Sequence, residues 1–94
     1  MREIVTESRS VVGDNQESMD IRYAILEEEA PFGHFGCVRY GIRIEKKDGE
    51  WDEVKDITTS RTQIDELFAL LCRNGVTPMS LREVLEDWFG LFSR

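Results

Sequence analysis

Hydrophobic and polar residues alternate along the first part of the chain, and this period changes near Ile57. Apolar side chains at every second position are typical of strands that bury one face. Met19, Ile21, Tyr23 and Ile25 show the pattern clearly, with polar residues between most of them. Four strands are predicted, at residues 2–12, 19–28, 36–47 and 51–57. We therefore expect a mostly antiparallel, four-stranded sheet with one buried face, whose strand order the pattern leaves open.

The turn between the third and fourth predicted strands sets which residues share a face. Asp48-Gly49 is typical of a tight turn, but a two-residue loop would place Val54 on the polar face. A three-residue loop with Gly49 in the left-handed region pairs Ile44 with Val54 and makes the apolar sides agree. The same parity puts Trp51 on the opposite, polar face. There it acts either as a cross-strand partner, the interpretation we favour, or as a binding platform.

After Ile57 the apolar residues recur with the period of a helix. Two serines are followed three residues later by Gln or Glu, the spacing of a capping box at a helix start. These pairs are Ser60 with Gln63 and Ser80 with Glu83. Two helices are predicted, at residues 60–74 and 80–91, with Gly75 ending the first.

Each predicted helix carries an apolar stripe that needs a surface to cover. The stripes are Ile64, Leu67, Phe68 and Leu71 in the first helix, and Leu81, Val84, Leu85 and Trp88 in the second. Because the link at residues 75–78 is short, both helices should pack on the same face of the sheet. We expect one α+β domain over residues 1–94, with an N-terminal sheet and two C-terminal amphipathic helices on one face.

The charge balance limits the class of partner. The 94 residues include 19 acidic and 12 basic side chains, a formal net charge of −7, which repels nucleic-acid phosphates and anionic lipid headgroups. We therefore do not expect nucleic acid as a partner, and no apolar run approaches the ~20 residues of a membrane span. Arg22, Arg39 and Arg43 can share one sheet face. We interpret them as its solvated side, with a small basic patch as the alternative.

The C-terminal end holds more large apolar side chains than one narrow helical stripe can bury. Trp88, Phe89, Leu91 and Phe92 fall within five positions. Either this segment folds back to close the end of the sheet, or it contacts a partner. Together with Trp51, the residues Trp88, Phe89 and Phe92 form the candidate interaction surface. The partner is another protein or a second copy of the chain, and the predicted function is a small protein-binding or regulatory module without catalytic activity.

An alternative function centres on the loop that holds His34 and Cys37. His34 is the only histidine, and with Cys37 it can form a base and nucleophile pair or provide two metal ligands. A structural zinc site uses four ligands, and only Cys72 is left as a third, so we favour a histidine packed on the loop's aromatic rings. No catalytic, cofactor-binding or metal-binding residue is assigned. The alternative is a small-ligand or metal-binding protein, or a minor enzyme, at this loop.

Cysteine usage indicates the compartment. Two cysteines lie far apart in the sequence, and the residues after Met1 lack the apolar segment of a signal peptide. We expect free thiols and a cytoplasmic protein.

Several segments between Tyr40 and Trp88, about half of the chain, resemble a family of small uncharacterised bacterial proteins from anaerobic Gram-positive organisms, classed as a domain of unknown function. The matching segments are residues 40–46, 56–58, 74–78, 81–84 and 86–88. They include a strand with a closely packed glycine, a helix entry and a Thr-Pro helix link. The resemblance implies a β-rich half followed by two helices in a cytoplasmic bacterial protein, and it supplies no activity or ligand. Residues 31–36 and 89–92 fall outside the match.

Overall fold

Strands and helices follow one another along the chain without mixing. The computed structural model describes residues 1–13, 16–29 and 38–92, apart from the side chains of residues 91 and 92. The strands are β1 (Arg2–Val12), β2 (Ser18–Glu29), β3 (Val38–Lys46) and β4 (Trp51–Thr58), and the helices are α1 (Arg61–Arg73) and α2 (Leu81–Phe92). A short 3-10 turn, η1 (Pro78–Ser80), precedes α2. The predicted α+β fold is confirmed.

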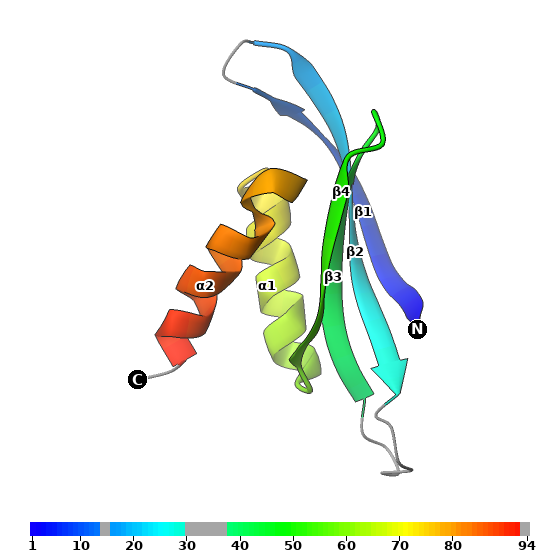
Figure 1. Ribbon diagram of the computed structural model, residues 1–94, viewed down its shortest axis with the longest axis vertical. Coiled ribbons are helices and arrows are strands. Elements are labelled where there is room, and N and C mark those ends of the chain that lie inside the picture. Colours follow the sequence, from blue (N-terminus) through cyan, green and yellow to red (C-terminus); the bar gives the residue numbers. More distant parts are fainter. Residues whose placement is uncertain (14–15, 30–37, 93–94) are drawn as a thin grey trace.

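The sheet is an antiparallel meander in which sequence neighbours are also spatial neighbours. Its order is β1-β2-β3-β4, so β1 and β4 form its two edges. Seen edge-on, the sheet has both helices on one side, as predicted (Figure 1). The β1–β2 hairpin extends past the helices at its tip, and the C-terminal end of α2 points away from the sheet (Figure 1). One sheet face is thus covered and the other is left open.

The β3–β4 turn has the predicted odd length but a different register. Lys46 N–H donates to Glu50 O at 2.7 Å, which leaves three loop residues, and Gly49 has a φ of +103°. Val54 faces Ile42, however, and the predicted pairing with Ile44 is wrong by two residues. The left-handed residue of such a loop is its last, so the loop ends at Gly49 and begins one position earlier than predicted. A shift of two residues leaves every side chain on the same face of the sheet, so Val54 still packs against the core.

A bulge in β4 lies opposite Gly41. Ile42 pairs with Val54, but Tyr40 pairs with Thr58, so the register shifts by two residues between them. Asp56, in the bulged stretch, has a φ of +56°, which side chains adopt rarely. A Cβ on Gly41 would lie 2.5 Å from Val54 O. Glycine therefore allows β4 to pass close to β3 at this point.

The core fills the space between the covered sheet face and the two helices. Its fully buried large side chains come from alternate positions of β2 and β3 and from the helical stripes: Ile21, Tyr23, Ile25, Ile42, Ile44, Ile64, Leu67, Leu71 and Leu81. The Tyr23 hydroxyl donates to Val76 O at 2.8 Å, joining the sheet to the chain just after α1. The hydroxyl of the buried Tyr23 thus has a hydrogen-bond partner inside the core, as the burial of a tyrosine requires.

Helix α1 begins and ends as its sequence indicates. Ser60 caps it, accepting from Gln63 N–H at 3.2 Å. The return bond of the capping box runs through Thr58, whose Oγ1 accepts from Ser60 N–H and donates to Gln63 Oε1 at 2.7 Å. At the other end Gly75 has a φ of +61°, and Val76 N–H donates to Leu71 O, the bonding of a Schellman motif.

Helix α2 begins differently from the prediction. Ser80 lies inside the η1 turn, whose N-cap is Thr77 and whose first residue is Pro78. The Ser80 hydroxyl is within hydrogen-bonding distance of the Thr77 hydroxyl, at 3.3 Å. The predicted N-cap position of Ser80 is therefore wrong, because proline at the first position of a turn starts the helical geometry three residues earlier.

Candidate functional site

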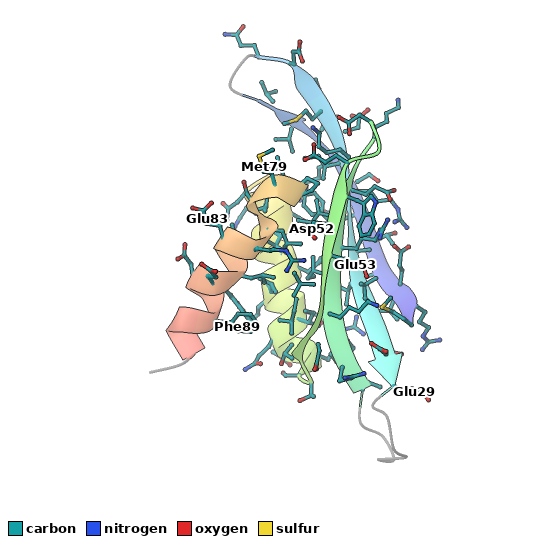
Figure 2. All side chains as sticks on the ribbon, viewed as in Figure 1. Glu29, Asp52, Glu53, Met79, Glu83 and Phe89 are labelled. Carbon is teal, nitrogen blue, oxygen red and sulfur yellow. The ribbon has the colours of Figure 1, made fainter. Side chains whose placement is uncertain are left out.

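The three described residues of the predicted aromatic surface, Trp51, Trp88 and Phe89, do not form one exposed surface. Trp88 is only 8% exposed and belongs to the core, so its predicted place on an exposed surface is wrong. It continues the α2 stripe of Leu81 and Leu85, and its ring centroid lies 5.3 Å from that of Phe89 in an edge-to-face arrangement. Phe89 is 40% exposed on α2 (Figure 2), whereas Trp51 is 52% exposed on β4. The Phe92 side chain lies outside the described part of the molecule.

The alternative loop site is not tested by the structure. His34 and Cys37 both lie outside the described residues, so a role for them stays a prediction. Cys72, the third potential ligand, is a free, buried thiol, and burial raises its pKa to about 12. Within residues 1–13, 16–29 and 38–92, no group of three or more His, Cys, Asp or Glu side chains is placed to hold a metal ion.

The sheet face opposite the helices, which we call the open face, gathers charged side chains and one tryptophan. Two rows of directly opposed residues cross all four strands. The first row is Thr6, Ala24, Arg43 and Glu53, and the second is Ser8, Arg22, Glu45 and Trp51. All these side chains point away from the core, because their neighbours along each strand face the helices. The open face is therefore a separate surface from the exposed part of α2.

Arg43 connects three other side chains of the open face, Glu45, Glu53 and Trp51. Its guanidinium donates to Glu53 Oε1 at 2.8 Å across the strands and to Glu45 Oε2 at 3.0 Å along its own strand. The hydrogen bonds that Arg43 donates, first to Glu45 and then to Glu53, raise its pKa above the ordinary value. Charge-assisted bonds to two carboxylates hold a guanidinium in a fixed orientation.

That orientation places Arg43 over Trp51. The guanidinium carbon lies 4.2 Å from the centre of the indole ring, within the range of a cation–π interaction. Trp51 faces Glu45 across the strands and remains about half exposed. The prediction that Trp51 lies on the polar face is confirmed. The Trp51 side chain is thus exposed to solvent and also held in position by Arg43.

The other arginines of the open face are also paired with carboxylates. Arg22 binds Glu3 through two bonds of 2.6 and 3.0 Å, and the Arg22 bond lowers the pKa of Glu3. Arg39 lies 3.5 Å from both Glu28 and Asp56. These pairs neutralise the small basic patch that the sequence left as an alternative. Beneath them, Ala24 and Leu26 are buried although they point toward the open face.

A hollow of about 240 Å³ adjoins the second row of the open face. Its lining includes Ser8, Arg22 and Glu45 from that row, together with Asp20, Lys46 and Lys47. The Lys47 ammonium lies 3.8 Å from Asp20, across the opening between the β1–β2 hairpin and the β3–β4 turn. Glu45 lines this hollow and also faces Trp51 across the strands, so the hollow and Trp51 lie close to the same β3–β4 turn.

Sequence reasoning placed Trp51 but missed its partner. Arg43 and Trp51 share a face by parity, and a diagonal neighbour lies within reach of a long side chain. The signal in the sequence was therefore the register of the β3–β4 hairpin. With the correct loop, Glu45 faces Trp51 and Arg43 takes the diagonal position.

None of the helices among the described residues is long and apolar enough to cross a membrane.

The model of DUF6514, a family of unknown function, matches residues 2–91 of the 94-residue chain. The chain therefore belongs to this family. The resemblance to a family of unknown function is confirmed, while the bacterial, Gram-positive origin stays a prediction. No curated protein matches the chain, and no solved structure matches it either.

Proposed function

We propose that this member of the DUF6514 family is a non-catalytic protein-binding module that recognises a basic segment of a partner protein through its open face, with Trp51 as the anchor. The observation that carries the proposal is the exposed Trp51 ring, held at 4.2 Å by an arginine that two carboxylates fix in place. Tryptophan and arginine are the residues most enriched among those that dominate binding energy at interfaces.

Rigidity favours Trp51 over the other exposed aromatic residue. It lies on a strand of a four-stranded sheet, and its stacking partner is fixed by hydrogen bonds. A side chain that is ordered before binding loses less conformational entropy when a partner arrives. Phe89 lies near the C-terminal end of α2, where the helix points away from the sheet (Figure 1). The sheet therefore offers the better platform.

The net charge of the chain, more than the exposure of its charged groups, indicates the chemistry of the partner. In the Arg43–Glu45 pair the carboxylate side chain is 38% exposed and the guanidinium side chain 24%. In the Arg39–Asp56 pair the values are 59% and 26%. In the Arg22–Glu3 pair the guanidinium side chain is the more exposed, at 40% against 33%, so exposure alone does not decide the sign of the partner. The net charge of −7 over the whole chain favours a partner with lysine or arginine side chains.

A cytoplasmic, bacterial setting belongs to the same proposal. It is supported by the buried thiol of Cys72, which suits a reducing compartment, and by the resemblance of residues 40–88 to proteins of anaerobic Gram-positive bacteria. We assign no cofactor and no catalytic residue to the module.

The proposal is tested by capturing partners from native bacterial lysate with the tagged chain and measuring the affinity of the enriched protein. Trp51→Ala should weaken binding at least tenfold, because it removes the anchor and leaves Arg43 without its stacking partner. Phe89→Ala is the matched control, an exposed aromatic residue on the helical layer, and should bind as wild type. Affinity should also fall steeply with added salt.

Three outcomes contradict the proposal. The first is equal binding by wild type and Trp51→Ala, and the second is a loss of binding caused by Phe89→Ala instead. The third is the absence of any enriched partner that carries a basic binding segment.

A further inference from the structure

The two edges of the sheet differ in how well they are closed. At the β4 edge, Arg82 of α2 binds Asp52 at 3.0 and 3.1 Å and reaches the Glu53 carbonyl at 3.4 Å (Figure 2). The bulge around Asp56 further interrupts that edge. The β1 edge is a strand of eleven residues whose middle section, Thr6 and Ser8 to Ser10, is exposed. A long outer strand offers its unpaired N–H and C=O groups to another strand.

The sequence of β1 is complementary to itself when reversed about Ser8. Opposite each other across this centre stand Val5 and Val11, Thr6 and Ser10, and Glu7 and Arg9. In two antiparallel copies of β1 centred on Ser8, valine would therefore pair with valine, hydroxyl with hydroxyl, and acid with base, on both sides of the central serine. β2 has a comparable centre at Ile21, with Asp20 opposite Arg22, but β2 is an inner strand and already pairs on both sides.

The two residues of each proposed pair also lie on the same face of the sheet. Val5, Glu7, Arg9 and Val11 lie opposite Ile25, Tyr23, Ile21 and Met19 of β2, so they are on the helix side of the sheet. Thr6, Ser8 and Ser10 are on the open face. Residues directly opposite in an antiparallel pair point to the same side, so the helices of both copies would lie on one side of a joined sheet. The bulge at Ile4 falls outside the paired section.

We propose that two copies of this chain associate through their β1 edges, antiparallel and centred on Ser8, to form one continuous sheet. Glu7 of each copy pairs with Arg9 of the other. Within one copy these two side chains already bind each other along the strand at 2.5 Å, with about half of each exposed, so both are available at the edge without losing a charged partner. This interface uses neither Trp51 nor the aromatic end of α2, and it does not depend on the proposed function.

Charge reversal provides the first test, with mass in solution measured by light scattering and native mass spectrometry. Wild type should have twice the 10.9 kDa mass of one chain. Glu7→Arg and Arg9→Glu should each weaken the dimer at least tenfold, because each sets like charges opposite one another. An equal mixture of the two variants should form a heterodimer, and the double exchange Glu7→Arg/Arg9→Glu should restore the homodimer. Formation of the heterodimer also shows that the single variants fold.

A disulfide provides the second test and fixes the register. In a Cys37→Ser background, Ser8→Cys should form a covalent dimer on mild oxidation, because position 8 faces itself and directly opposed strand residues lie within disulfide range. Ser10→Cys is the matched control, an exposed serine on the same face of the same strand. Its two copies would lie about 13 Å apart along the strands and should not cross-link.

The proposal is overturned by a wild-type chain that stays monomeric at millimolar concentration. It is equally overturned if the single charge variants remain dimeric, if their mixture does not associate, or if Ser8→Cys and Ser10→Cys cross-link to the same extent. Trp51→Ala should leave dimer formation unchanged, which separates this proposal from that of the open face.

Discussion

At Gly41 the lack of a side chain decides how the sheet is built. A Cβ at this position would lie 2.5 Å from Val54 O and 3.0 Å from the Lys55 Cα, both of them backbone atoms. Backbone cannot move aside as the end of a flexible side chain can, so a methyl group would push β4 away and disturb the bulge that follows.

Gly41→Ala should therefore lower the free energy of unfolding by about 1–3 kcal/mol, the usual cost of overpacking. Gly90→Ala is the control, since a Cβ there meets no atom within 4 Å. It lies inside α2, where alanine should raise the stability by about 0.5–1 kcal/mol. Urea unfolding followed by circular dichroism measures both. Equal effects of the two changes would show that the close approach does not hold β4.

For individual residues, the sequence predicted the sheet face of a side chain better than the side chains that it contacts. Trp51 was placed on the polar face by parity alone, and parity survived an error of two residues in the register. Arg43 was missed as its partner because diagonal neighbours depend on the register itself. Trp88 was assigned both to the apolar stripe of α2 and, because four large apolar residues crowd the end of that helix, to the candidate interaction surface; only the stripe is confirmed. It is buried because it continues the stripe of Leu81 and Leu85.

At the scale of elements, the start of α1 is a network of three side chains. The Thr58 hydroxyl accepts from Ser60 N–H and donates to Gln63 Oε1, while Ser60 Oγ accepts from Gln63 N–H. The capping-box spacing identified the helix start from the sequence. It did not indicate Thr58, because the bond from Ser60 N–H to the hydroxyl two residues earlier is a local turn that the capping-box spacing does not include.

Thr58→Val should cost about 1 kcal/mol of stability, because it keeps the shape of the side chain but removes both hydrogen bonds of the hydroxyl. The neighbouring Thr59 is exposed, so Thr59→Val should change the stability by less than about 0.5 kcal/mol. Thermal and urea unfolding of the two variants give the comparison. If both variants match the wild type, the Thr58 bonds do not support the helix.

The hairpins were predicted as elements, whereas the strand order was not. Local turn chemistry joins β1 to β2 and β3 to β4, but the pairing of β2 with β3 closes across residues 30–37 and depends on side chains distant in sequence. The bulge in β4 was also beyond prediction. It requires both the glycine at position 41 and the positive φ of Asp56, which no periodic pattern records.

The whole molecule is more extended than its length requires. Its radius of gyration is 13.9 Å, against about 12 Å expected for a compact domain of this size. The β1–β2 hairpin and the end of α2 account for this shape, because both extend away from the core (Figure 1). Pairing of two β1 edges would join two such molecules along the sheet. Both open faces would then lie on one side, so a partner with two basic segments would gain avidity.

The core of the molecule couples its stability to alkaline pH through two groups on different layers. Tyr23 of β2 and Cys72 of α1 are both buried, and burial raises the pKa of each to about 12, from ordinary values of 10.0 and 9.0. As pH rises through the ordinary values, the unfolded chain releases protons that the folded chain still holds. The free energy of unfolding therefore falls above about pH 9, by up to ~1.4 kcal/mol per pH unit for each group, and levels off near pH 12.

Cys72→Ala separates this effect from the titration of lysines and other groups on the surface. The variant is less stable at neutral pH because it leaves a small cavity, but it lacks the first of the two groups to titrate. Its loss of stability should begin near pH 10, where Tyr23 ionises in the unfolded chain, instead of near pH 9. Urea unfolding at several pH values between these limits measures the difference in slope. The Cys72 thiol and the Tyr23 hydroxyl lie on opposite layers of one core. If the wild type and Cys72→Ala lose stability in parallel as pH rises, the Cys72 thiol is not shielded from water. Helix α1 would then pack on the sheet less tightly than the burial of Cys72 indicates.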